Sequence, residues 1–138
     1  MTNLIAESTL LGGIIDFLED IDGLHAYPFP VPGMVTPFCI PLLRAEYSAH
    51  YEGTSGPWTG SLLVMTKFGD GTSGGYELLD YTSPTGAKSI HAAVLTDTTM
   101  GGIAGNVRIT GPEDDISLVD GPGGAKYYAR RLGIEVYT

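Results

Sequence analysis

The sequence predicts a single α+β domain over residues 1–138, with helices packed on one face of an antiparallel or mixed β-sheet that contains a long hairpin. Three observations predict this class. An amphipathic apolar stripe opens the chain, two alternating stretches follow it closely, and two short helical segments separate that pair from two further strands. Helices grouped apart from hairpins are typical of α+β folds. At 138 residues the chain is long enough for one core.

The first helix is predicted over residues 3–21. Its apolar positions recur at intervals of three, four and seven, at Leu4, Leu11, Ile14, Ile15, Leu18 and Ile21. Thr2 or Asn3 can cap this helix, and Gly23 can end it. The pair Gly12-Gly13 costs roughly 1 kcal/mol per glycine inside a helix, so it predicts a kink or a close helix contact there.

A proline-rich segment and a hairpin follow the helix. Three prolines in residues 27–32 force extended geometry. Residues 38–51 become an alternation of apolar and polar side chains and predict a strand, in which Pro41 indicates an edge position or a bulge. After the turn residues 53–57, a second alternation over residues 58–68 predicts an antiparallel partner. The two strands form the long hairpin.

The second half of the chain predicts two short helices and two more strands. The helices cover residues 76–81 and 88–95 and are separated by the breaker Ser83-Pro84-Thr85-Gly86. Val107 and Ile109 mark a short strand. Tyr128, Leu132, Ile134 and Val136 alternate in the last one, after a glycine-rich and acidic excursion over residues 111–124.

The last strand carries the residues that we expect at a subunit interface. Its polar face holds Arg131, Tyr127 and Tyr137, together with Ala129 and Glu135, while Arg130 falls among apolar positions. Tyrosine and arginine on a lightly charged sheet face suit a protein interface. Arg130 is either a residue at the margin of the sheet, with its charged end in solvent, or the partner of an acidic group in an intersubunit salt bridge.

Acidic residues dominate the charge of the chain. Seven basic and sixteen acidic side chains give a formal net charge of -9, which disfavours binding to nucleic-acid phosphates. Glu113, Asp114, Asp115 and Asp120 lie in the acidic excursion, and Asp70 lies in a glycine-rich loop. Their spacing lacks the regular pattern of a calcium loop, so solvated loops are the first interpretation. In an oligomer, a ring of such loops would concentrate negative charge around a bore.

The stretch from Gly69 to Gly74 spells G-x-G-x-x-G after a predicted strand and before a predicted helix, and Asp97 follows at a distance that suits a dinucleotide fold. Asp70 would place a carboxylate beside a bound pyrophosphate, and the preceding strand belongs to a hairpin. We therefore interpret the stretch as a turn, with nucleotide binding as an alternative.

Other site chemistry is sparse in the sequence. The lone Cys39 lies in an apolar run, which predicts a buried and unreactive thiol, and no disulfide framework follows from it. No G-x-S-x-G elbow is present, and no apolar run approaches the roughly 18 residues of a membrane span. We expect no enzyme activity, no cofactor and no membrane partner.

Several short segments resemble the small neck-region proteins of long-tailed phages that infect actinobacteria, above all the tail terminators. These segments are Asp22-Gly23-Leu24-His25-Ala26-Tyr27-Pro28, residues 84–90, Met100-Gly101-Gly102, Val107-Arg108-Ile109-Thr110-Gly111 and Gly133-Ile134-Glu135-Val136-Tyr137. They follow one another in order over nearly the whole chain.

The resemblance implies a homo-hexameric ring in the neck of the virion, assembled in the host cytoplasm. Such a ring caps the major tail tube protein, ends its polymerisation, joins the tail to the head-to-tail connector and lets genomic DNA pass through its bore. A head-to-tail stopper or adaptor of the same neck is the second interpretation. A nucleotide-binding protein that uses residues 69–74 is the third, and a monomeric binding module is the fourth.

Overall fold

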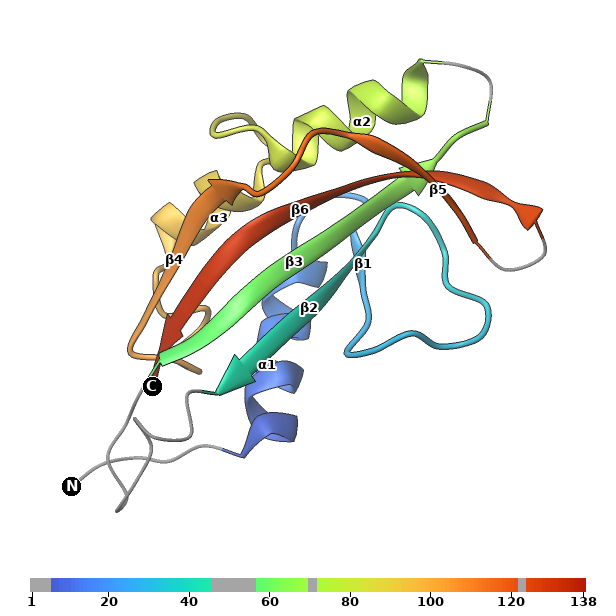
Figure 1. Cartoon of the computed structure of the whole chain (residues 1–138). Helices are drawn as coiled ribbons and strands as arrows, with labels where there is room; N and C mark the ends of the chain where they lie inside the picture. Colours follow the sequence, from blue (N-terminus) through green and yellow to red (C-terminus); the bar gives the residue numbers. More distant parts are fainter. Residues whose placement is uncertain (1–5, 46–56, 70–71, 122–123) are drawn as a thin grey trace.

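A computed structural model of the chain describes residues 6–45, 57–69, 72–121 and 124–138. These residues form three helices and one six-stranded mixed sheet, which confirms the predicted α+β class (Figure 1). The elements are α1 (Glu7–Glu19), β1 (His25–Ala26), β2 (Phe38–Ala45), β3 (Pro57–Lys67), α2 (Ser73–Thr82), α3 (Ile90–Thr96), β4 (Asn106–Pro112), β5 (Ser117–Asp120) and β6 (Lys126–Tyr137).

The sheet has the order β1-β2-β3-β6-β4, and β5 also pairs with β6. β1 runs parallel to β2, whereas every other pairing is antiparallel. The predicted long hairpin is present as β2 and β3, which pair from Phe38 with Met65 to Ala45 with Trp58. Its tip and the predicted end of the first strand, residues 46–56, lie outside the described residues.

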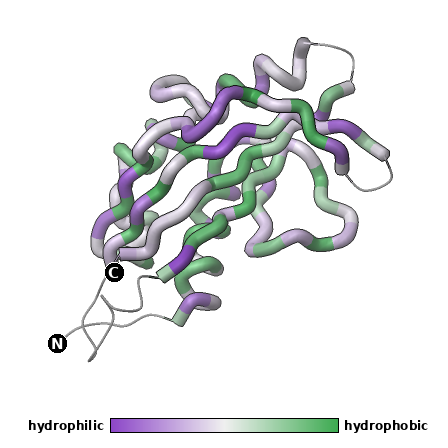
Figure 2. The backbone as a smooth tube through the Cα atoms, viewed as in Figure 1, coloured by the Kyte–Doolittle hydropathy of each residue, from purple (hydrophilic) through white to green (hydrophobic). Residues whose placement is uncertain are grey.

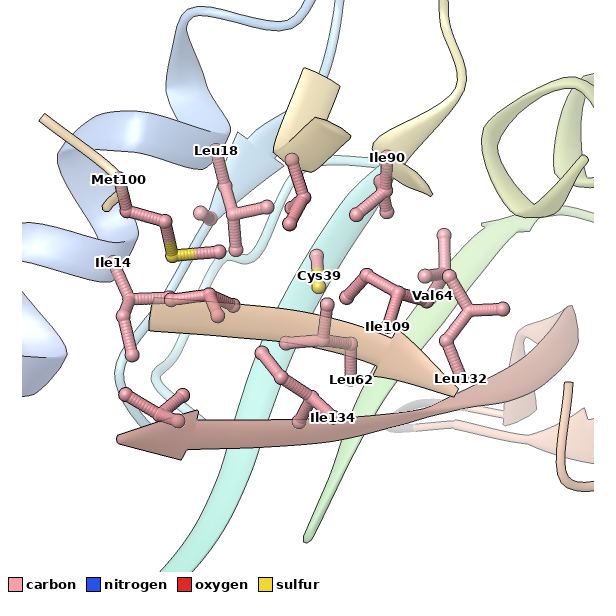
Figure 3. Packing of buried hydrophobic residues seen from close by; sticks show 14 of the residues in the cluster. Ile14, Leu18, Cys39, Leu62, Val64, Ile90, Met100, Ile109, Leu132 and Ile134 are labelled. Atoms are coloured by element: carbon pink, nitrogen blue, oxygen red, sulfur yellow. The ribbon is translucent and has the colours of Figure 1, made fainter. Parts of the chain in front are cut away.

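The three helices cover the same face of the sheet. In Figure 1, α1 and α3 lie behind the strands and α2 lies along the top of the sheet. Side chains from all three helices and from β2, β3, β4 and β6 join one buried cluster, part of which Figure 3 shows around Cys39, Leu62 and Ile134. Because successive strand residues point to opposite faces, the remaining strand side chains point away from the helices. We call that side the open face.

Helix α1 follows the predicted stripe but is shorter than residues 3–21. It ends at Glu19, and Gly23 adopts a φ of +77° in the turn that follows. The predicted caps, Thr2 and Asn3, lie outside the described residues. A Cβ at Gly13 would overlap the side chain of Ile103, whereas a Cβ at Gly12 would meet nothing within 4 Å. The close approach at Gly13 is therefore made by a loop, so the prediction of a close helix contact is wrong about the partner.

Pro41 has no backbone N–H, but at its position in β2 no N–H is needed for a hydrogen bond to β3. The backbone of His25 donates to the Pro37 carbonyl and that of Tyr27 to the Cys39 carbonyl, each at 3.0 Å. Alternate residues of β2, including Pro41, therefore direct their backbone groups toward β1 and away from β3. The described pairing with β1 ends at Cys39, so the prediction of an edge position is confirmed.

Two strands were not predicted. The two-residue β1 pairs with β2 although only the segment 27–37 connects them, and we call this segment the strap. The supposed excursion 111–124 contains β5, which pairs with β6 from Ser117 with Ala129 to Asp120 with Lys126. β4 and β5 thus lie end to end along one side of β6. The second and third helices also differ slightly from the prediction, beginning at Ser73 and Ile90.

Candidate functional site

The open face has an apolar centre. Phe38, Ile40 and Leu42 of β2 lie beside Leu63 and Met65 of β3, and Leu42 is 46% exposed. Figure 2 shows β2 as a largely hydrophobic strand. No helix of the described chain covers this face, but Phe38 and Ile40 are each 3% exposed, so the part that a partner can reach is limited to Leu42 and the half-buried Leu63 and Met65.

The strap covers one end of this apolar centre. The ring of Tyr27 meets that of Phe38 edge to face at 5.9 Å, and Phe38 meets Tyr127 at 6.5 Å. The backbone N–H of Val35 donates to the Tyr27 hydroxyl at 3.0 Å. The contact of Tyr27 with Phe38 joins the strap to β2, and the hydrogen bond from Val35 to Tyr27 closes the strap on itself. The strap bends and turns, with Gly33 at a φ of +74°, so the prediction of a wholly extended segment is wrong.

A hollow of about 600 Å³ lies between the strap and the end of β3. Its apolar lining comes from Met34, Val35, Phe68 and Tyr127, and Lys67 and Lys126 add positive charge. We call it the strap pocket. The pocket can take a large apolar side chain from another molecule, and Lys67 favours an acidic neighbour beside that side chain, since Lys126 is paired with Asp120.

The other end of the open face is polar and flat. Gly60 and Gly133 line a shallow hollow of about 560 Å³ together with Arg44, Thr59 and Glu135, among other residues. A Cβ at Gly133 would overlap the Thr110 hydroxyl, and a Cβ at Gly60 would overlap the Leu42 carbonyl. The glycines therefore allow the strands to approach closely and leave this part of the surface low.

Two of the predicted interface residues hold the junction between β4 and β5 together. Four residues, 113–116, stand between the two strands, opposite only Arg130 and Arg131 of β6. Asp114 fills this bulge: one carboxylate oxygen accepts from the backbone N–H of Arg131 and the other from its Nε, each at 3.0 Å. Figure 2 shows the two hydrophilic segments side by side.

Arg130 reaches in the opposite direction, toward the helices. Its Nε donates to the Asp114 carbonyl at 3.1 Å, and a terminal nitrogen donates to the hydroxyl of Thr82 at 3.2 Å. Thr82 is 3% exposed at the end of α2. Arg130 thus joins α2 to the bulge and uses its charge within the subunit, so an intersubunit salt bridge is not needed to explain its position.

The remaining predicted interface residues are the two tyrosines of β6. Tyr137 is 44% exposed at the end of β6, and Tyr127 is half-buried in the strap pocket. The expectation that Ala129 is exposed is wrong, because this residue is 5% exposed between Met65 of β3 and Ser117 of β5. The missed strand β5 is the reason for this error.

Most acidic residues of the predicted bore loops are paired. Asp120 accepts a hydrogen bond from Lys126 at 2.8 Å, and Glu113 accepts one from the Ser61 hydroxyl. The backbone N–H of Arg131, and then its side chain, lowers the pKa of Asp114. Asp115 is exposed, and Asp70 lies outside the described residues. The strongest concentration of negative charge lies elsewhere.

Acidic and basic residues are distributed unevenly between the two layers of the fold. The helical layer, residues 6–24 and 72–105, contains eight acidic residues and one basic residue, namely Glu7, Asp16, Glu19, Asp20, Asp22, Glu77, Asp80 and Asp97 against Lys88. The described sheet layer contains five acidic and six basic residues, namely Glu113, Asp114, Asp115, Asp120 and Glu135 against Arg44, Lys67, Arg108, Lys126, Arg130 and Arg131. The helical layer is therefore strongly negative, and the sheet layer is nearly neutral.

The glycine-rich stretch 69–74 joins β3 to α2. A Cβ at Gly74 would overlap the backbone carbonyl of Lys67, so this glycine lets α2 pack closely on the end of β3. In a dinucleotide fold the preceding strand has a parallel neighbour at this point. β3 instead lies between two antiparallel neighbours, β2 and β6. Residues 70–71 of the loop lie outside the described part.

Cys39 is buried as predicted, with no exposed surface, and burial raises the pKa of its thiol. Among the described residues, no group of three or more histidine, cysteine or acidic side chains is arranged to hold a metal ion. None of the helices in the described part of the chain has the length and apolar character needed to cross a membrane.

Comparison with known proteins gave no match, either to a family model or to a curated protein.

Proposed function

We propose that this protein is a structural neck protein of a long-tailed phage, a tail terminator whose copies form a hexameric ring on the end of the tail tube. The ring ends polymerisation of the major tube protein and presents its other side to the head-to-tail connector. The protein is part of the virion and assembles in the host cytoplasm. The proposal rests on the resemblance of the segments named above.

The structural observation that supports this proposal best is the one-sided arrangement of the fold. A closed ring of identical subunits needs two different complementary surfaces on each subunit. The open face, with its apolar centre and strap pocket, differs in shape and charge from the helical layer on the other side of the sheet. Such a pair of surfaces suits head-to-tail association of copies.

The charge of the helical layer also suits passage of DNA. A surface with eight acidic residues and one basic residue repels phosphate, so DNA would not adhere to it. The proposal therefore extends from the loops at residues 113–120, whose acids are mostly paired, to the part of the helical layer that does not contact the next copy, as a further candidate for the surface nearest the bore.

Native mass spectrometry of the purified chain, alone and with purified tail tubes, tests the proposal. A sixfold ring, or a monomer that forms a sixfold cap on tube ends in negative-stain images, is the expected result. A twelvefold species would favour a connector. A monomer that ignores tubes would refute both neck assignments.

A tube-growth assay tests the terminating activity itself. The chain is added to polymerising tube protein, and tube lengths and total polymer mass are measured. A terminator shortens the tubes at constant polymer mass, because it blocks ends. A fall in polymer mass without shortening would mean that the chain sequesters tube subunits, which contradicts capping.

A further inference from the structure

Helix α2 carries an apolar and acidic strip on the side turned away from the sheet. Tyr76 is 66% exposed and Leu79 is 42% exposed, and Asp80 is exposed beside them. Positions three and four residues apart are neighbours on a helix, so these three side chains form one continuous surface. We call it the ridge. Large exposed apolar side chains that lie together mark interaction sites.

The ridge lies in a negative environment. Tyr81, on the buried side of the same helix, has its pKa raised to about 12 by burial and by the nearby carboxylates of Glu77, Asp22 and Asp80. Two cations contact this helix, Lys88, whose Nζ lies 5.7 Å from the centre of the Tyr81 ring, and Arg130, which donates to Thr82, and both meet buried residues outside the ridge. A partner of the ridge would therefore combine an apolar hollow with positive charge.

The strap pocket has this combination. Met34, Val35, Phe68 and Tyr127 line it, and Val35 is 52% exposed at its margin. Lys67 is exposed there and forms no ion pair within the described part of the chain, whereas Lys126 is bound to Asp120. Tyr76 or Leu79 fits the apolar lining, and Asp80 suits Lys67.

The pocket and the ridge lie on opposite faces of the sheet, because the pocket lies under the strap on the open face and the ridge lies on the outside of α2. We propose that the ridge of one copy docks in the strap pocket of the next. This contact rests on the proposed function, since it is the head-to-tail interface that a ring requires. The charge difference between the layers also favours this contact, because the negative helical layer of one copy then meets the nearly neutral sheet layer of the next.

Disulfide trapping tests the contact directly. The double variant Val35→Cys/Leu79→Cys places one thiol at the pocket and one on the ridge. Oxidation is expected to give a ladder of covalent multimers, because each copy links to two neighbours. Cys39 does not interfere, since it is fully buried. The matched control is Val35→Cys/Leu95→Cys, because Leu95 is 64% exposed on α3 and outside the ridge. Equal ladders in the two variants would overturn the proposal.

A mixing experiment tests the direction of the contact. Lys67→Glu removes the charge match of the pocket and keeps the ridge, whereas Tyr76→Glu alters the ridge and keeps the pocket. Each variant alone is expected to self-associate at least about ten-fold more weakly than the native chain. An equimolar mixture should form a one-to-one heterodimer through the remaining intact pair of surfaces. Two variants that stay monomeric in the mixture, with native circular dichroism, would refute the assignment.

The results separate this contact from the proposed function. A native ring or tube cap without the specific ladder refutes the contact and leaves the terminator proposal standing. The specific ladder without any capping of tubes supports the contact and refutes the terminator. A native chain that neither associates nor caps refutes both.

Discussion

Replacement of Asp114 by alanine tests how the bulge between β4 and β5 is stabilised. The change removes both carboxylate oxygens that accept hydrogen bonds from Arg131, one from its backbone N–H and one from its Nε. It leaves a backbone N–H of a central strand without its acceptor. The bulge, and with it the position of β5, then depends on the backbone hydrogen bond from Glu113 to the Arg131 carbonyl at 2.8 Å and on the contact of the Asp114 carbonyl with Arg130.

The expected loss in the free energy of unfolding is about 2 kcal/mol. A hydrogen bond contributes roughly 1 kcal/mol net, and one to a charged group contributes more. The side chains of Asp114 and Arg131 are 35% and 51% exposed, so solvent screening limits the ion pair itself to under about 1 kcal/mol. Asp114→Asn keeps one acceptor for the backbone N–H and should lose about half as much.

The effect depends on pH with a defined sign. Hydrogen bonds from Arg131 lower the pKa of the folded Asp114 carboxyl below its ordinary value. A carboxyl with a lowered folded pKa contributes stability above its unfolded pKa and loses that contribution as the pH falls through the folded pKa. The difference between the native chain and Asp114→Ala should therefore be largest near neutral pH and shrink below about pH 4.

Urea unfolding at pH 7 and at pH 3 measures this difference. The control is Asp115→Ala, because Asp115 is exposed and forms no hydrogen bond within the described residues. Its substitution should change stability by less than about 0.5 kcal/mol. Equal losses for the two variants, or a loss at Asp114 that stays the same at pH 3, would refute the reasoning.

Three further predictions concern the helical side of the fold. Gly12→Ala should raise the free energy of unfolding by about 0.5–1 kcal/mol, since the added methyl meets nothing. Gly13→Ala should lower it, because the added methyl overlaps Ile103. Calorimetry that shows the same sign for both variants would contradict the packing of α1. Arg130→Met should cost about 1–2 kcal/mol in urea unfolding, because Thr82 and the Asp114 carbonyl each lose a donor, and an unchanged midpoint would exclude this role. Cys39 should react with a thiol reagent only as fast as the chain unfolds, since it is fully buried with its pKa raised, and rapid labelling of the native protein would show an opening of the core.

Local patterns predicted the elements that bury a regular set of side chains. The apolar stripe predicted α1, because helix periodicity over many residues has few alternative explanations. The alternation on both sides of residues 53–57 predicted the hairpin of β2 and β3, and Pro41 predicted a free edge. Burial of Cys39 followed from its apolar neighbours in sequence.

The tertiary structure alone decided the features that depend on distant partners. The two-residue β1 is too short to show a period, and it exists because Pro37 and Cys39 accept its hydrogen bonds. Likewise β5 was interpreted as part of an acidic loop, because its pairing with β6 depends on a bulge that Asp114 stabilises from across the ladder.

For the candidate site too, some features follow from the sequence and others only from the tertiary structure. The sequence by itself determined the total charge of -9 and the tyrosines and arginines of the last strand. It could not determine that acidic residues gather in the helical layer, nor that Asp114 pairs with Arg131 within the chain. The strap pocket and the ridge likewise depend on the fold, because the pocket joins residues near positions 35, 68 and 127. Such surfaces arise only when the chain folds, since contacts between residues far apart in sequence leave no local pattern.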